Sequence, residues 1–292
     1  MPRNPKIEVA AINLRISDDK ERDYSALLVD IARLKKGIRV HGDTYLALNK
    51  YDPNDRLGVF SKYTEIDLDG DWFDVEDFDI ADAMKIGKVS IPDGIRPNLS
   101  QFWFRLKEDL HIVVFETYSL SRALSARSVE KYFKEALAVG SIKEKYGLVE
   151  ADIVKSFGEV DRLLALPDLK EIRITVRRPN TDDVGEDLAK VIEERLKRQK
   201  AREYEEILKT GSGEALDPDQ RTKALANVAA DNGEVRVKSL INGVLVPQDT
   251  SQSPLIEVDT HAPDGYDSIL FEQLVESISS KIRAARESRR VE

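Results

Sequence analysis

The pattern of apolar and polar positions predicts that the chain opens with a strand followed by a helix. Seven of the ten residues 7–16 are apolar, which is typical of a buried strand. A helix is predicted next, because apolar side chains recur three and four residues apart at Tyr24, Leu27, Leu28, Ile31 and Leu34. Two strand-like runs, 44–50 and 57–66, then flank a turn that contains Pro53 and Asn54, and this arrangement indicates a hairpin.

The middle of the chain continues with strands and helices in irregular order. A second hairpin is predicted from 102–106 and 111–115, and Val129, Tyr132 and Phe133 mark the apolar face of a helix. Further segments are strands at 148–154 and 172–176 and a short helix at 160–166. Hairpins next to isolated helices predict an α+β fold, with a mixed, largely antiparallel sheet and helices mainly on one face.

The last third is predicted to be rich in helices. A long charged helix is expected from about 186 to 208, a second helix begins near Pro218, and a final helix begins at Tyr266. Between them, Asn242-Gly243 favours a tight hairpin because both residues tolerate positive φ. We therefore expect an α+β core domain at residues 1–180 and a helical extension with a β-hairpin and a C-terminal helix at residues 181–292.

Composition excludes several classes of protein. No apolar run approaches the ~18 residues that a membrane span needs, and we expect a cytoplasmic protein without a membrane partner. The absence of cysteine excludes disulfides, thiolate metal sites and cysteine nucleophiles. Neither a glycine-rich phosphate loop nor a Gly-x-Ser-x-Gly elbow is present, so the sequence gives no support for ATP, NAD or serine-hydrolase chemistry.

The charge is concentrated in one segment. The formal net charge is -9, and residues 65–84 hold nine acids and no base. The rest of the chain is balanced, with 45 acids and 45 bases. The nine acids are Glu65, Asp67, Asp69, Asp71, Asp74, Glu76, Asp77, Asp79 and Asp82.

The acidic segment supports several interpretations. On a strand, Glu65, Asp67 and Asp69 would share one face, where clustered carboxylates could hold magnesium for a magnesium-dependent nuclease. Alternatively, the run Asp71-Trp72-Phe73-Asp74 could anchor a basic protein partner, as in a DNA-mimic-like interaction module. The same aromatics could instead fold back onto the sheet, and the acids could simply be a solvated strand face and loop.

Basic residues of the second half suggest a different partner. Arg195, Lys197, Arg198 and Lys200 crowd one stretch of the predicted long helix, and Arg177 and Arg178 end a strand. Several cations on one surface are what phosphate neutralisation requires, so these residues are candidates for nucleic-acid binding. Because acids surround the helical cluster, a salt-bridged solvent helix is the alternative. Separately, Glu257, Asp259 and His261 alternate along a predicted strand and could meet one ion.

Four sets of residues, in order, resemble a known family. They are Gly42-Asp43-Thr44-Tyr45; Thr64-Glu65-Ile66-Asp67-x-Asp69-Gly70-x-Trp72-Phe73-Asp74; Ile91-Pro92 with Arg96-Pro97-Asn98; and Ile174-x-Val176 leading to Pro179-Asn180. Over residues 5 to 185 the chain resembles the bacterial domain of unknown function 4747 family. The resemblance implies cytoplasmic proteins encoded near mobile-element and phage-defence genes, without an activity that can be assigned to residues.

These observations lead to one main hypothesis. We expect a nucleic-acid-associated or partner-binding component of a bacterial mobile-element or anti-phage defence system. The alternatives are the magnesium-dependent nuclease and the acidic protein-interaction module. The sequence leaves open whether the protein is an enzyme and whether it forms a homo-oligomer, and it indicates no cofactor except magnesium in the nuclease hypothesis.

Overall fold

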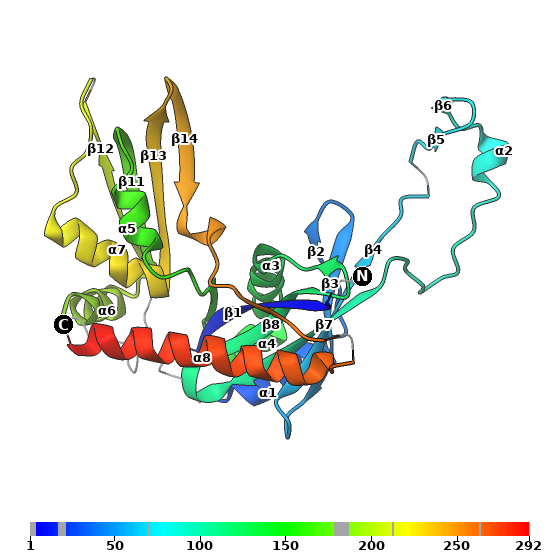
Figure 1. Cartoon of the computed structure of the whole chain (residues 1–292), viewed down its shortest axis with the longest axis horizontal. Helices are drawn as coiled ribbons and strands as arrows, with labels where there is room; N and C mark the ends of the chain where they lie inside the picture. The colour runs from blue at the N-terminus through cyan, green and yellow to red at the C-terminus, as the bar shows by residue number, and fades with distance from the viewer. Residues whose placement is uncertain are drawn as a thin grey trace.

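The computed structural model describes residues 4–16, 22–68, 70–177, 187–211, 213–262 and 264–291, the side chains of 187, 231 and 288–291 excepted. Figure 1 shows a central body, a second sheet at one end, an arm at the other, and one long helix along the base. The predicted fold class is confirmed, because the chain is α+β and the strand pairs of the described residues are antiparallel. None of the described helices is both long enough and apolar enough to span a membrane.

The central body is built on a large antiparallel sheet with the strand order β10-β1-β8-β7-β4-β3-β2, to which β15 and β9 add at β1 and β8. Its longer strands include both predicted hairpins, β3/β4 and β7/β8. The strands are β1 (Lys6–Ile16), β2 (Ile38–His41), β3 (Thr44–Asp52), β4 (Leu57–Thr64), β7 (Ser100–Lys107), β8 (Ile112–Ser119), β9 (Arg122–Ala123), β10 (Val149–Ile153) and β15 (Glu257–Thr260).

Helices cover both faces of this sheet. One face packs against α1 (Tyr24–Arg33), α3 (Ala126–Leu137) and α4 (Gly140–Tyr146), and the other packs against α8 (Asp267–Val291). The strand β1 explains why, because Ile12 and Leu14 enter the first core while Val9 and Ala11 enter the second. A strand that is apolar on both faces must be covered twice. A short 3-10 turn, η1 (Glu108–Leu110), connects β7 to β8.

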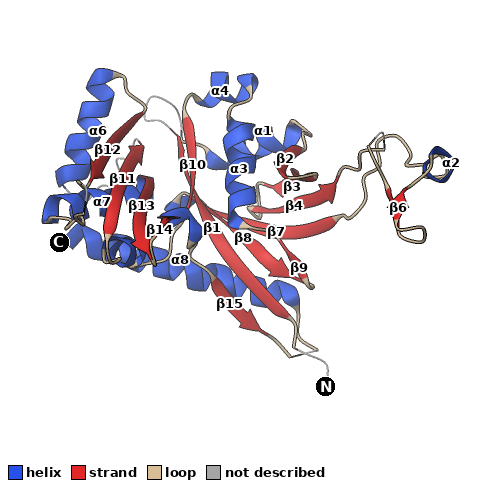
Figure 2. Cartoon of the chain, turned by 90° about the horizontal axis from the view of Figure 1, so that it is seen from above, coloured by secondary structure: helices blue, strands red, loops and turns tan. Residues whose placement is uncertain are grey.

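A second sheet is formed by the later part of the chain, with the order β12-β11-β13-β14. Three helices pack on one of its faces and share one apolar core with it (Figure 2). The predicted Asn242-Gly243 hairpin joins β13 to β14, and both residues have positive φ, +50° and +77°. The elements are α5 (Glu159–Leu164), β11 (Leu169–Arg177), α6 (Asp187–Gln199), β12 (Glu203–Lys209), α7 (Gln220–Asn232), β13 (Gly233–Ile241), β14 (Val244–Asp249) and η2 (Thr250–Gln252).

The predicted helix 186–208 is wrong in its last third. The helix α6 ends at Gln199, and Lys200 takes a left-handed φ of +53°. The amide of Ala201 then donates to the carbonyl of Leu196 at 2.9 Å, which closes the helix end. Residues 203–209 form β12 because their side chains alternate between the helix side and solvent, a period of two rather than 3.6.

A buried ion network joins the two sheets. Asp152 of β10 accepts hydrogen bonds from Arg15 of β1 and from Arg177 at the end of β11. Burial alone would raise the pKa of Asp152, but the charges of Arg15, Lys155 and Arg177 lower it to about 2. The strand β11 precedes residue 180 but belongs to the second sheet, whereas α8 packs on the first sheet. The division into a core domain at 1–180 and a helical extension at 181–292 stays a prediction.

Candidate functional site: the projecting arm

Residues 65–99, called the arm here, leave the body between β4 and β7. Figure 1 shows the arm extending away from the large sheet, with β5 (Phe73–Asp74), β6 (Asp79–Ile80) and α2 (Ala83–Ile86) near its far end. Phe73 is 59% exposed, so its ring does not fold back onto the sheet as a lid. The acidic segment of the sequence is therefore a projection of the fold rather than one face of a long strand.

Polar contacts fix the base of the arm. The Glu65 amide donates to the Asp43 carbonyl at 2.9 Å, and the Thr64 amide donates to the Pro97 carbonyl at 3.1 Å. The Glu65 carboxylate accepts two hydrogen bonds from the Arg96 guanidinium, at 3.1 and 2.9 Å. It also accepts the Tyr45 hydroxyl, and this hydrogen bond raises the pKa of Tyr45. Glu65 thus ties the outgoing and returning chains of the arm to the body.

The far end of the arm is held together by polar bonds rather than by a core. Asp74 accepts the amides of Glu76 at 2.9 Å and Asp77 at 3.3 Å, and the Lys85 ammonium bonds both Asp74 and Asp77. The hydrogen bond from Lys85 makes the largest contribution to lowering the pKa of Asp74 to about 2, and the two backbone amides make smaller ones. The Asp82 carboxylate caps α2 by accepting the Met84 amide at 2.7 Å. These bonds organise a hairpin whose strands are only two residues long.

Apolar side chains gather on the outside of this organised end. Phe73 and Phe78 meet edge to face at 5.2 Å between ring centroids, and Phe78 is nevertheless 82% exposed. Of the 21 large apolar side chains that are exposed in the described part of the chain, ten lie in the arm. They are Ile66, Leu68, Phe73, Val75, Phe78, Ile80, Met84, Val89, Ile95 and Leu99. Such a concentration of exposed apolar side chains is characteristic of binding sites.

The predicted partner-binding run Asp71-Trp72-Phe73-Asp74 divides into two roles. Asp71 and Phe73 are exposed, whereas Asp74 holds the turn and Trp72 is half-buried, with its backbone carbonyl accepting the Ala81 amide at 2.7 Å. Sequence reasoning did not single out Met84, which α2 presents at 80% exposure. The signal in the sequence was an apolar residue two positions after a helix-capping aspartate, Asp82.

The magnesium hypothesis finds no arranged site in the described residues. Glu65 is paired with Arg96, Asp67 is exposed, and Asp69 lies outside the described residues. Within the described ranges, no three His, Asp or Glu side chains are grouped so that they could hold a metal ion. The Glu257, Asp259 and His261 arrangement also separates, because Glu257 pairs with Lys281 and His261 bonds Asp267 at 2.6 Å. The nuclease role of Glu65, Asp67 and Asp69 stays a prediction.

The basic residues of the second half are mostly engaged with other side chains. Arg177 bonds Asp152, Lys197 pairs with Glu193 at 2.5 Å, and Arg195 lies over the Tyr204 ring at 5.4 Å. Arg198 and Lys200 are exposed, and Arg178 lies outside the described residues. Their role in nucleic-acid binding stays a prediction.

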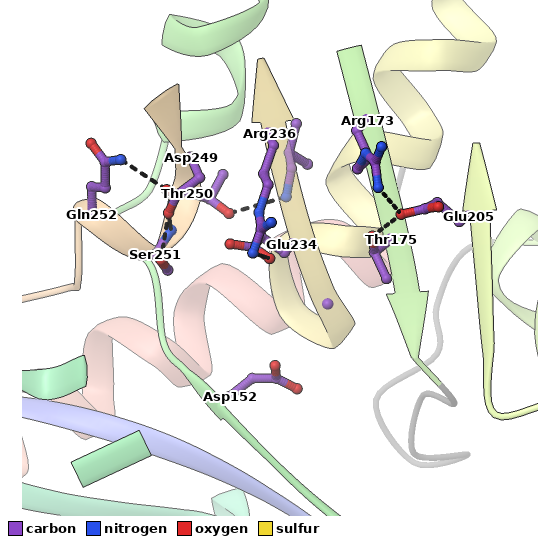
Figure 3. Close-up of polar contacts among 12 residues, drawn as sticks. Asp152, Arg173, Thr175, Glu205, Glu234, Arg236, Asp249, Thr250, Ser251 and Gln252 are labelled. Carbon is purple, nitrogen blue, oxygen red and sulfur yellow. Dashed lines mark hydrogen bonds and ion pairs between the residues drawn. The ribbon is translucent and has the colours of Figure 1, made fainter. Parts of the chain in front are cut away.

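The solvent face of the second sheet is polar but balanced in charge. Figure 3 shows Arg173 donating to Glu205, which also accepts the Thr175 hydroxyl, with Arg236 beside Glu234. The ion-pair distances are 3.1 Å for Arg173 to Glu205 and 2.8 Å for Arg236 to Glu234. Opposite charges that neutralise one another across strands do not produce the basic surface that phosphate binding requires.

The whole-chain comparison identifies the family. A family model described as Domain of unknown function (DUF4747) matches residues 5–277. The chain belongs to the DUF4747 family. The predicted resemblance is confirmed, and it extends beyond residue 185 through the second sheet and into α8. The arm therefore lies inside the DUF4747 domain. A search of curated proteins finds no match.

Proposed function

We propose that this DUF4747 protein is a partner-binding protein whose arm docks into a partner protein. The observation that carries the proposal is the set of exposed apolar side chains, above all Phe73, Phe78 and Met84, on a polar, prearranged support. Aromatic side chains at the centre of an interface supply most of the binding free energy in protein complexes. The bacterial mobile-element or defence context stays an expectation.

The charge of the arm defines the surface of the partner. Residues 65–99 contain ten acids and three bases, a net charge of -7 out of -9 for the chain. Within the described residues, Asp71, Glu76 and Asp79 form no ion pair. A partner groove with an apolar centre and a basic rim complements this surface, and the charges would accelerate the encounter. The same charge repels a nucleic acid, which is why a protein is the favoured partner of the arm.

The organisation of the arm favours tight binding. A hairpin with two residues in each strand is not stable by itself in water, so the bonds of Asp74, Lys85 and Asp82 maintain its shape. Because the shape already exists in the free protein, less conformational entropy is lost when a partner binds.

The experiment compares binding of the intact protein and arm variants to a purified partner. The partner is first isolated from a bacterium that encodes the protein and is then produced alone. Titration calorimetry should show that Phe78→Ser and Met84→Ser each weaken binding at least tenfold, because each removes an apolar anchor of about 1.4 kcal/mol or more. Raising the salt concentration should slow association, since the rim contacts are charged.

The matched control is Val244→Ser, because Val244 is 63% exposed on the β13–β14 hairpin at the opposite end of the molecule. This variant should bind normally, and circular dichroism should show the same fold for all variants. Equal affinity of Phe78→Ser, Met84→Ser and the unaltered protein would refute docking through the arm. If sedimentation shows that only copies of this chain associate through these residues, the heterologous partner is also refuted.

A further inference from the structure

A cleft of about 580 Å³ lies between α3 and the β2–β4 edge of the large sheet. This cleft, called the basic cleft here, is lined by Val40, His41, Thr44, Lys62, Ala123, Leu124, Ser125, Arg127, Ser128 and Lys131. Cationic side chains come from two elements, Lys62 from β4 and Arg127 and Lys131 from α3. The lining, which consists of described residues, includes no acid. A volume of this size matches a small-molecule site.

The ammonium of Lys62 has no carboxylate partner among the described residues. It donates instead to the Ala123 carbonyl and lies 5.5 Å from the centre of the Phe102 ring. Burial lowers the pKa of Lys62, and the neighbouring charge of Arg122 adds a smaller effect in the same direction. Two cations near each other, one of them partly buried, create a positive potential that a bound anion would relieve.

The floor of the basic cleft adds uncharged donors. Ser125 caps α3 by accepting the Ser128 amide at 3.1 Å, and the two hydroxyl oxygens lie 2.8 Å apart. The amides of Ala126 and Arg127 find no acceptor within the described part of the chain. A phosphate oxygen accepts hydrogen bonds of this kind, and the positive end of a 12-residue helix favours the negative charge.

Lys131 and Arg127 complete the walls. Lys131 lies 3.5 Å from the Val40 carbonyl and 3.8 Å from the Glu135 carboxylate, a loose pair that leaves its ammonium available to a ligand. Arg127 is held at 3.0 Å from the Ser251 hydroxyl and 3.2 Å from Asp249, which fixes one wall to the end of β14 and to η2. The cations are therefore positioned by the fold on different sides of one cavity.

We propose that the basic cleft binds a small phosphorylated molecule of about mononucleotide size, with its phosphate group between Lys62, Lys131 and the first turn of α3. A nucleic-acid strand is disfavoured because a polymer needs a continuous basic path. The cationic lining here is confined to Lys62, Arg127 and Lys131, so it does not provide such a path. This inference does not depend on the arm having a protein partner.

The test is titration calorimetry with inorganic phosphate, AMP and ATP, and with a single-stranded 12-mer oligonucleotide that lacks terminal phosphates. The nucleotides should bind, and Lys62→Met and Lys131→Met should each weaken that binding at least tenfold while the 12-mer binds negligibly. Methionine keeps the apolar length of each side chain. The exposed Lys143→Met of α4 is the matched control and should leave nucleotide affinity unchanged.

A second readout separates ligand binding from a purely structural role of the lysine. NMR titration of the Lys62 ammonium should show that its pKa rises when phosphate or AMP is added, because a bound anion stabilises the charged form. Absence of nucleotide and phosphate binding by the folded protein would overturn the proposal. So would nucleotide binding that Lys62→Met and Lys131→Met leave unchanged, or binding of the 12-mer with an affinity equal to that of the nucleotides.

Discussion

At the scale of single residues, Glu116 is the acid of the described residues whose ionisation the fold opposes most clearly. Only 4% of its surface is exposed, and burial raises its pKa to about 7, although the Trp103 amide donates to its carboxylate at 2.7 Å. In the unfolded chain the group would ionise near its ordinary value of 4.5. The folded state therefore holds a proton that the unfolded state loses between about pH 4.5 and 7.

This linkage predicts a pH dependence of stability. The contribution of Glu116 is fully present below about pH 4.5 and is lost as pH rises to about 7, a change on the order of 3 kcal/mol. Glu116→Gln cannot ionise, so urea unfolding should show that the variant gains stability relative to the unaltered protein as pH rises from 5 to 8. The exposed Glu144→Gln should show no such trend. Parallel curves for Glu116→Gln and the unaltered protein would contradict this explanation.

At the scale of elements, the pairing of β11 with β13 depends on a close backbone approach. A Cβ atom on Gly233 would lie 1.9 Å from the Thr175 carbonyl oxygen, and the neighbouring register pair is Val176 with Gly233. Backbone cannot move aside as a flexible side chain can. The first residue of β13 is thus restricted to glycine by the neighbouring strand.

Gly233→Ala should consequently destabilise the second sheet by about 1–3 kcal/mol, the cost of forcing extra volume into a packed site. The matched control is Gly140→Ala, because a Cβ at Gly140 meets no atom within 4 Å. Denaturant unfolding followed by circular dichroism measures both. Equal unfolding midpoints for Gly233→Ala and Gly140→Ala would show that β11 and β13 can move apart to accept the methyl group without loss of stability.

At the scale of the whole molecule, Asp152 joins the two sheets through two arginines. Removing its charge leaves Arg15, whose side chain is 3% exposed, without its buried carboxylate. Because removing one partner of a buried ion pair costs about 3–5 kcal/mol, Asp152→Asn should lower the free energy of unfolding by that amount at pH 7. The exposed Asp161→Asn should be close to neutral.

The pH dependence of this pair has the opposite sign to that of Glu116. Because the folded pKa of Asp152 is about 2, below its ordinary 3.8, its stabilisation is present above about pH 4 and is lost as pH falls toward 2. The difference between Asp152→Asn and the unaltered protein should shrink over that range in urea titrations. A difference that stays constant down to pH 2 would mean that the charge of Asp152 does not hold the junction.

The sequence by itself determined the local elements and the site of unusual charge. The buried strand at 7–16, the two predicted hairpins of the large sheet and the Asn242-Gly243 turn follow from periodicity and from φ preference, which act over a few residues. The acidic segment was visible by counting, and the ordered motifs identified the family.

Only the tertiary structure decided which element covers which face. Val9 and Ala11 are apolar in the sequence, but that α8 packs on them depends on contacts between residues more than 250 positions apart. The same reason applies to the sites. The sequence shows that Phe78 is apolar and that Lys62 is charged. The path of the folded chain places Phe78 on a projecting arm and Lys62 beside the first turn of α3. Long-range packing, which leaves no local signal, determined both.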